Sequence, residues 1–400
     1  MPFSILHFAD LHLDGAFTGS RLPATLARQC REQLRQTLRR IVDLAKERNA
    51  GAVTVAGDLF ERTRLSPDTA AFLISEFERL GPIPVFIAPG NHDPADAGSL
   101  YQRGRWPENV NLFAGNRLTE RPLTKEISLW AAAHLSPSDR QNFLLHFQLP
   151  AANPSPYPIL LLHAALVTTP GQTTNNHAPV TIENIRQAGF PLALLGHYHT
   201  AQTARAGNAV AIYPGSPEPL GFDEPGQHGV TWIQVEPGQP PQVEIIALAE
   251  LRFETIDVSV EDCSHREQLF DKIMALQKER DFGKAFVRLR LVGNAPPSLF
   301  LDLPVLAHRV QDHFAFVHLE NLTRPSADLQ QLAQEPTVRG AFVREVLAAM
   351  QAEPVEAKPV KAELVKAEPA EAEPVEAQQR HLDALVYGLQ AFNQEEIALR

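Results

Sequence analysis

The sequence predicts a layered α/β fold, in which helices cover largely parallel β-sheets. The first observation is that short apolar runs alternate with longer stretches whose apolar residues recur at helical spacing. The second is that several runs, such as residues 159–162, are apolar throughout, which is typical of strands buried on both faces. Strands separated by helices connect in parallel through right-handed crossovers.

The expected elements of the first 250 residues follow one another in this alternating order. We expect helices at residues 26–46 and 68–80, and strands at residues 4–9, 52–56, 85–88, 159–162 and 192–195. From residue 209 the composition changes to two strand-like runs, 230–235 and 243–247, separated by a Pro/Gly-rich turn. We expect this β-rich segment to close a first domain, residues 1–250.

A small α+β domain is expected over residues 251–345. Its predicted strands are residues 253–258, residues 286–292 and a run near Val317, and its predicted helices are residues 265–280 and 303–314. Within the next segment, 346–379, the stretch 351–378 contains seven Glu, three Lys and repeated Ala-Glu-Pro-Val-Glu-Ala units. This composition buries too little apolar surface to fold, so we expect a disordered, extended linker.

An amphipathic helix is expected over residues 380–400. One face carries a stripe of apolar residues at helical spacing: Leu382, Leu385, Val386, Leu389 and Phe392. Such an apolar stripe is expected to be covered, either by a binding partner or by another part of the same chain.

Composition excludes several classes of protein. The chain has 400 residues, of which 44% are hydrophobic, so neither a single small domain nor global disorder is expected. No apolar run approaches the ~20 residues of a membrane helix, and the first residues lack the basic region of a signal peptide. Cys30 and Cys263 are the only cysteines and stand far apart, which argues against disulfides and cysteine-bound zinc. We expect a cytoplasmic protein without a membrane partner.

The net charge of the whole chain, −11, argues against nucleic-acid binding. The charge is unevenly distributed, however, because residues 21–48 contain eight Lys or Arg and only three Asp or Glu. This segment fits a basic helix, and a solvated helix face explains the same charges.

Side chains that bind metals stand where five of the expected strands end. They occur in the segments Asp10-Leu11-His12, Gly57-Asp58, Gly90-Asn91-His92-Asp93, His163 and Gly196-His197-Tyr198-His199. The carboxyl ends of parallel strands lie along one edge of a sheet, so these segments are expected to converge. Residues at i and i+2 leaving a strand point to the same side, so Asp10 and His12 are expected to reach one ion, as are His197 and His199.

The ligand types point to two transition-metal ions and to phosphoester hydrolysis. Imidazole, carboxylate and amide together suit Mn, Fe or Zn better than Ca or Mg. Seven ligands exceed what one ion takes, and two ions bridged by a carboxylate such as Asp58 would activate water and clamp a phosphate. Each element alone is common: His163 fits a hydrogen-bonded core residue, and Gly90 and Gly196 fit ordinary turns.

Taken together and in order, these motifs resemble the signature of calcineurin-like metallophosphoesterases. Residues 8–14, residues 57–60 and Tyr213-Pro214-Gly215-Ser216-Pro217 are similar to the DNA-repair exonuclease branch, which includes the SbcCD nuclease subunit and YhaO-like relatives. Leu11 and Leu13-Asp14 are closer to the YhaO-like group. The likeness covers about residues 1–250, with weaker likeness to residue 345, and implies a four-layer sandwich followed by an α+β cap domain.

The resemblance implies a role for each motif residue. Asp10, His12, Asp58 and His199 would hold one metal ion and Asp58, Asn91, His163 and His197 the other, with Mn²⁺ as the usual metal. His92 would contact the phosphate and help the leaving oxygen to depart. Asp93 would orient His92, and a turn carboxylate before Pro94 is the alternative. Four further histidines match no motif position and are assigned to packing or the surface: His134, His146, His177 and His228. His228 is also a candidate for supporting a ligand from behind.

The resemblance also implies DNA as substrate and a coiled-coil ATPase as partner. The α+β domain would cap the site and position DNA, and its basic residues are Lys278, Arg280, Lys284, Arg288 and Arg290. The terminal helix would bind the base of the ATPase coiled coil, and homodimerisation is left open. We therefore expect a two-metal DNA exonuclease of repair or recombination. The alternatives are a phosphoesterase for small esters or nucleotides and a non-catalytic scaffold, which would have lost ligands.

Overall fold

The computed structural model describes residues 2–17, 22–150, 155–168, 177–279, 282, 285–296, 299, 301–325, 329–352, 381, 384, 385, 388 and 389. The chain divides into two compact units, Met1–Arg252 and Phe253–Arg400.

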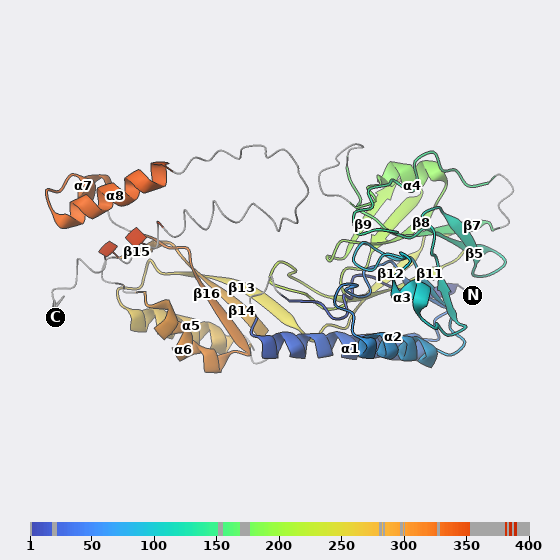
Figure 1. The fold of residues 1–400 in the computed structure, drawn as a ribbon, viewed down its shortest axis with the longest axis horizontal. Helices are drawn as coiled ribbons and strands as arrows, with labels where there is room; N and C mark the ends of the chain where they lie inside the picture. Colours follow the sequence, from blue (N-terminus) through green and yellow to red (C-terminus); the bar gives the residue numbers. More distant parts are fainter. Residues whose placement is uncertain are drawn as a thin grey trace. The chain divides into compact units, whose positions relative to one another are not determined.

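The first unit contains two six-stranded sheets (Figure 1). The order in the first sheet is β12 (Gln242–Ala247), β11 (Gly229–Val235), β1 (Phe3–Phe8), β2 (Ala52–Val55), β3 (Val85–Ile87) and β4 (Val110–Leu112). The order in the second is β5 (Thr119–Pro122), β6 (Ile127–Ala131), β7 (Tyr157–His163), β8 (Leu192–Gly196), β10 (Ala209–Tyr213) and β9 (Gln202–Ala206). Strands β1 to β4 run parallel, as do β6, β7, β8 and β10. The predicted α/β sandwich is confirmed.

The helices of this unit are α1 (Ala24–Glu47), α2 (Pro67–Arg79), α3 (Leu100–Arg103) and α4 (Ile182–Ala188). Helix α1 buries one face because Cys30, Leu34, Leu38 and Ile41 recur every three or four residues. Helix α4 lies on β9 and β10 and starts with a capping box formed by Thr181 and Asn184. None of the helices in the described part of the chain is long and apolar enough to cross a membrane.

Strand β7 shows why the apolar runs form central strands. Ile159 and Leu161 join the core between the two sheets, whereas Leu160 and Leu162 join a second core on the other face, with residues of α4. Successive side chains of a strand point to opposite faces, so a strand covered on both sides needs apolar residues at every position. The run ends at His163, which is also fully buried.

His7 on β1 is a buried polar residue of this core and leads to a prediction about stability. Its Nε2 donates to the Leu195 carbonyl at 3.3 Å, and its Nδ1 lies 3.0 Å from the Thr54 hydroxyl. Burial lowers the pKa of His7 from its ordinary value to about 4. The unfolded chain therefore binds a proton between pH 6.5 and 4 that the folded chain does not, and stability falls as the pH falls through this window.

We expect the wild type to lose about 2 kcal/mol more unfolding free energy between pH 7 and pH 5 than the variant His7→Gln does. Urea unfolding of both proteins at the two pH values measures this difference. Equal losses in the two proteins would show that His7 does not contribute to the pH dependence.

The second unit contains a three-stranded sheet in the order β13 (Arg252–Ser259), β14 (Ala285–Val292) and β16 (Phe316–Asn321), and a two-stranded sheet of β15 (Asn294–Ala295) and β17 (Arg324–Pro325). Its helices are α5 (Arg266–Glu279), α6 (Leu303–Val310), α7 (Leu329–Ala333) and α8 (Val338–Ala352). The helix expected at 303–314 is shorter than predicted, because a 3₁₀ turn over Gln311–His313 follows α6.

Residues 346–352, which were expected to belong to the linker, are helical instead, because α8 continues to Ala352. Val346, Leu347 and Met350 on this helix pack against a small apolar cluster, which explains why the helix extends. Residues 353–380 lie outside the described residues. Of the expected terminal helix, Leu385 and Leu389 are described; both are helical and are buried in the same cluster as Val343 of α8.

These two leucines therefore contact their own chain. Gly388 between them lies so close to Phe342 that an added Cβ would approach its ring to 2.2 Å. Leu382, Val386 and Phe392 of the expected stripe lie outside the described residues.

Candidate metal centre

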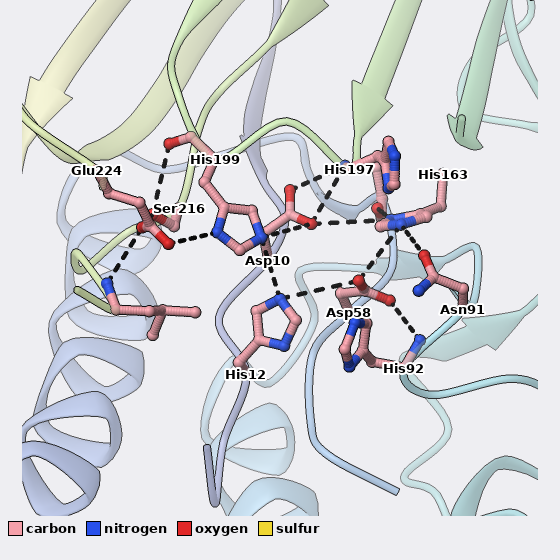
Figure 2. A network of polar contacts seen from close by, with 12 residues as sticks. Asp10, His12, Asp58, Asn91, His92, His163, His197, His199, Ser216 and Glu224 are labelled. Atoms are coloured by element: carbon pink, nitrogen blue, oxygen red, sulfur yellow. Dashed lines mark hydrogen bonds and ion pairs between the residues drawn. The ribbon is translucent and has the colours of Figure 1, made fainter. Parts of the chain in front are cut away.

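The predicted ligands converge where the two sheets of the first unit meet (Figure 2). Asp10, Asp58 and Asn91 follow β1, β2 and β3 of the first sheet, whereas His163 ends β7 and His197 follows β8 of the second. The carboxyl ends of both sets of parallel strands face the same region, so each sheet supplies part of one site.

One group of ligands consists of Asp10, His12 and His199. The Nε2 atoms of His12 and His199 lie 3.3 Å apart, and Asp10 Oδ1 lies 4.0 Å from His199 Nε2. The Nδ1 of His12 donates to Glu61 at 2.8 Å, and the Nδ1 of His199 donates to Glu224 at 2.6 Å. These carboxylates accept the Nδ1 protons and turn both Nε2 atoms toward each other. Burial would lower the pKa of His199, but the hydrogen bond to Glu224 and the charge of Asp10 raise it to about 9, so a proton on Nε2 takes the place that a cation would occupy. A bound cation satisfies such an arrangement.

The second group consists of Asp10, Asp58 and His163. Asn91 lies against His163, and Asp58, His163 and Asn91 are drawn to the right of His12 and His199 in Figure 2. His163 Nδ1 donates to the Ala56 carbonyl at 2.9 Å, and burial holds the pKa of this imidazole well below its ordinary value. His163 is therefore neutral, with a lone pair on Nε2. That atom faces Asn91 Oδ1 at 2.9 Å and Asp58 Oδ2 at 3.4 Å, so three acceptors meet without a proton. This donor set fits a divalent cation.

Asp58 lies between the two groups. Its Oδ2 is 3.4 Å from His163 Nε2 and 3.8 Å from His12 Nε2. Its Oδ1 accepts a hydrogen bond from the His92 backbone N–H at 2.8 Å. Burial raises the pKa of the neighbouring Asp10 to about 7, and the charge of Asp58 contributes to the rise. Two buried carboxylates this close need compensating positive charge, and two cations would supply it.

The expectation that His197 and His199 reach the same ion is wrong. His199 joins Asp10 and His12, whereas the ring of His197 lies edge-on to that of His163, with 5.2 Å between centroids. The i, i+2 argument assumed an extended backbone, but the φ angle of His197 is 111°. The two imidazoles therefore diverge, in agreement with the ligand division that the family resemblance implies.

The backbone of the ligand segments is strained. Asp10, His12 and Asp58 adopt left-handed conformations with φ between 49° and 55°, which are rare for residues with a side chain. The strained segments are held by each other, because the Asp10 N–H donates to the Gly57 carbonyl and the His12 N–H to the Asp58 carbonyl. Such strain persists where the surrounding structure fixes it, and it is common at functional sites.

The glycines of the motifs are required by close packing. A Cβ added to Gly90 would lie 2.2 Å from Asp58 Oδ1, and one added to Gly196 would lie 2.0 Å from the Ala56 carbonyl oxygen. At these two positions a side chain would push the ligand segments apart. Gly90 and Gly196 are therefore part of the site rather than ordinary turn residues.

A model of the calcineurin-like phosphoesterase family matches residues 3–201, the stretch that supplies all seven ligands. The chain carries a calcineurin-like metallophosphoesterase domain. The metallophosphoesterase YhaO of Bacillus subtilis (strain 168), described as uncharacterized, is 28% identical over 379 residues, covering 88% of this chain and 91% of YhaO. The metallophosphoesterase fold binds two divalent metal ions, in keeping with the two ligand groups.

Two solved structures are also similar. The alignment with TT1561 of Thermus thermophilus covers 61% of this chain and 99% of TT1561, with 13% identity and a TM-score of 0.35. A dimetal phosphatase from Danio rerio covers 59% of this chain and 93% of its own, with 11% identity and a TM-score of 0.36.

His92 lies at the rim of the metallophosphoesterase site, with 45% of its side chain exposed. Its Nδ1 donates to Glu61, 3.0 Å from Oε1 and 3.1 Å from Oε2, so one carboxylate holds His92 and His12 together. Burial would lower the pKa of His92, but the hydrogen bond to Glu61 and the charge of Asp58 outweigh it and raise the pKa to about 9. The imidazole is thereby oriented and kept protonated.

Asp93 does not orient His92 through a hydrogen bond in the described structure. Its fully buried carboxylate instead accepts the backbone N–H groups of Asp58 at 3.0 Å, Leu59 at 2.7 Å and Gly90 at 2.7 Å, and the Tyr101 hydroxyl at 2.7 Å. It joins the segments after β2 and β3. Glu61 takes the orienting role that was expected of Asp93.

Several residues beyond the predicted ligands surround the site. His228 donates from Nε2 to the backbone carbonyl of Glu224 at 3.0 Å, so it contacts the residue that holds His199 and not a predicted ligand itself. His134 donates to the His163 carbonyl at 2.7 Å, and the ring of His177 lies 5.7 Å from that of His197, although both were assigned to packing or the surface. His146 is exposed.

Glu61 and Glu224 were not predicted. Glu61 directly follows the motif segment 57–60, and this position is the one signal in the sequence that points to it. Nothing in the sequence marks Glu224.

Glu61 leads to a prediction about activity. We expect Glu61→Gln to lower kcat for phosphodiester hydrolysis about 10- to 100-fold, because an amide holds two imidazoles less firmly than a carboxylate does. Steady-state kinetics on bis-p-nitrophenyl phosphate measure the loss, and Glu61→Asp, which keeps the charge, should recover part of it. A kcat equal to that of the wild type in Glu61→Gln would contradict the orienting role.

Proposed function

We propose that this chain is a two-metal DNA phosphodiesterase that acts as an exonuclease in double-strand-break repair or recombination, together with a coiled-coil ATPase. The observation that carries the hydrolytic part is the convergence of all seven ligand side chains beside an exposed, oriented His92. A scaffold that had lost catalysis would not be expected to keep this set.

Asp10, His12, Asp58 and His199 would hold one ion, and Asp58, Asn91, His163 and His197 the other, with Mn²⁺ as the proposed metal. When bound, a pair of divalent ions polarises the phosphate and acidifies water. His92 would hydrogen-bond a phosphate oxygen and give a proton to the leaving oxygen, and Glu61 would hold its ring in that orientation.

DNA is proposed as the substrate because residues 8–14, 57–60 and 213–217 are similar to the DNA-repair exonuclease branch. The match to YhaO extends beyond the phosphoesterase domain into the second unit. This second unit adds protein surface that binding of a small ester would not require. The ATPase partner rests on the same resemblance. Because Leu385 and Leu389 contact α8, such a partner would have to bind other surfaces or displace them.

Digestion of end-labelled linear duplex DNA, with and without Mn²⁺, tests the proposal. We expect nucleotides to be released from the ends only with metal, and not by the variant His92→Ala. Intact DNA alongside cleavage of bis-p-nitrophenyl phosphate, even with the ATPase added, would favour a phosphoesterase for small esters. Cleavage of neither substrate would overturn the hydrolytic function.

A further inference from the structure

We propose that Arg62 and Arg103, with Arg64 in the same turn as Arg62, form a phosphate-binding site for the nucleic-acid strand that continues past His92. This inference rests on the proposed function and adds to it the residues that recognise a polymer rather than a single phosphodiester.

Arg62 is attached directly to the His92 segment. Its backbone N–H donates to the His92 carbonyl at 3.1 Å, and the residue before it is Glu61, which holds the His92 imidazole. Arg64 follows in the same turn, with its N–H donating to the Glu61 carbonyl at 3.0 Å. These contacts place two exposed arginines at the side of the metal centre where His92 lies.

Arg103 reaches the same place from another segment. Helix α3 carries Tyr101, whose hydroxyl donates to Asp93 at 2.7 Å, next to His92 in the chain. A Cβ added to Gly98 would lie 3.4 Å from Arg62 Nη2, 3.5 Å from Asp96 Oδ1 and 3.8 Å from Arg103 Nη2. The guanidinium groups of Arg62 and Arg103 therefore lie on either side of Gly98. Because residue 98 has no side chain, the space between them is not filled by one.

The charge of this site is only partly compensated. Arg62 forms an ion pair with Asp96 at 2.5 Å. The side chains of Arg64, Arg103 and Arg105 form no ion pair or hydrogen bond with any described residue. The guanidinium groups of Arg64 and Arg103 therefore keep a charge that no described acidic side chain pairs with, and uncompensated positive charge attracts anions.

Other basic segments are better compensated. In α1, Arg35 pairs with Asp68 at 2.6 Å, and Arg40 pairs with the buried Glu218 at 2.8 Å. Arg290 of the second unit pairs with Asp257 at 2.6 Å, whereas Arg280 and Lys284 lie outside the described residues. Several arginines of the two basic stretches, residues 21–48 and 278–290, thus form ion pairs with acidic residues of the same protein.

The ligand that fits is a chain of phosphodiesters. The metal ligands and His92 can engage one phosphate, and the arginines lie outside that ligand set. In a nucleic-acid strand, phosphates recur every ~3.4 Å along the helix axis, so neighbouring charges are always present. The planar guanidinium group donates two parallel hydrogen bonds to phosphate oxygens. A substrate with a single phosphodiester has no second charge for these arginines.

The test measures kcat/KM of the 400-residue, Mn²⁺-loaded protein on two substrates: a single-stranded 20-nucleotide DNA and bis-p-nitrophenyl phosphate. For Arg103→Gln we expect the ratio of kcat/KM for DNA to that for the small ester to fall about 10-fold. The slope of log kcat/KM for DNA against log salt concentration should become shallower by ~0.7, the value for one phosphate contact with a single strand. Arg64→Gln should act in the same direction.

Arg205→Gln serves as the matched control, because Arg205 is an exposed arginine of β9 without an ion pair among the described residues. Its substrate ratio and salt slope should equal those of the wild type. Wild-type values for both Arg103→Gln and Arg64→Gln would overturn this inference and leave the nuclease intact. A wild-type protein that cleaves the small ester but not DNA would overturn both this inference and the proposed DNA substrate.

Discussion

The variant His92→Ala is expected to lose phosphodiester hydrolysis by about 10²- to 10⁴-fold and to keep its metal binding. The imidazole lies at the rim, with its Nδ1 hydrogen-bonded to Glu61, and no atom of its ring joins either of the two proposed ligand groups. Its backbone N–H, which bonds Asp58, is unaffected by the change of side chain. The loss should therefore appear in kcat rather than in metal affinity.

Single-turnover kinetics and Mn²⁺ titration by calorimetry separate these two effects. His146→Ala is the control, since His146 is an exposed histidine of the same domain, and it should retain wild-type values. Unchanged cleavage by His92→Ala would show that another group assists the leaving oxygen. A parallel loss of metal would instead place His92 among the ligands, beside His12 and Glu61, with which it forms a third group of neighbouring atoms.

The variant Asp58→Ala is expected to lose the metal pair and, with it, at least ~10³-fold of the activity. Asp58 Oδ2 is the atom that lies near the histidines of both groups, at 3.4 Å and 3.8 Å. Its removal takes one ligand from each proposed ion, and it leaves Asp10 as the remaining carboxylate of the site.

Metal content after dialysis against Mn²⁺, measured by inductively coupled plasma mass spectrometry, checks this prediction. We expect two ions per chain in the wild type and at most one in Asp58→Ala. Asp58→Asn, which keeps the size of the side chain, separates loss of charge from loss of packing. Asp43→Ala removes an exposed carboxylate that pairs with Arg79, and it should keep both ions. Two ions retained by the Asp58 variants would exclude a bridging role.

The long helices and several central strands were predictable because their signals are local, whereas the buried strands β6 and β10 were not predicted. The buried residues of α1 recur at helical spacing, and β7 and β8 are continuous apolar runs. The edge strands β5 and β9 were not predicted. They have four and five residues and are partly exposed, and pairing with β6 and β10 rather than their own pattern makes them strands.

The residues proposed as ligands were singled out from the sequence, but their arrangement was only partly predictable. Metal-binding residue types after successive strands point to one site whatever the details of the backbone. The division of His197 and His199 between two groups depends on a left-handed backbone that an extended-strand argument does not anticipate. Glu61, which was not predicted, holds His92 in place of Asp93, since a carboxylate orients whichever imidazole the folded chain brings within hydrogen-bond distance.

The sequence by itself determined the fold class, the order of the main elements and the identity of the metal ligands, because residue periodicity and residue type encode them locally. The tertiary structure alone decided which strands share a sheet, which carboxylates hold the ligand imidazoles and which arginines are left without acidic partners. Those properties depend on contacts such as Glu224 with His199, or Arg40 with Glu218, between residues 25 and 178 positions apart. Only the folded arrangement of the elements brings such residues together.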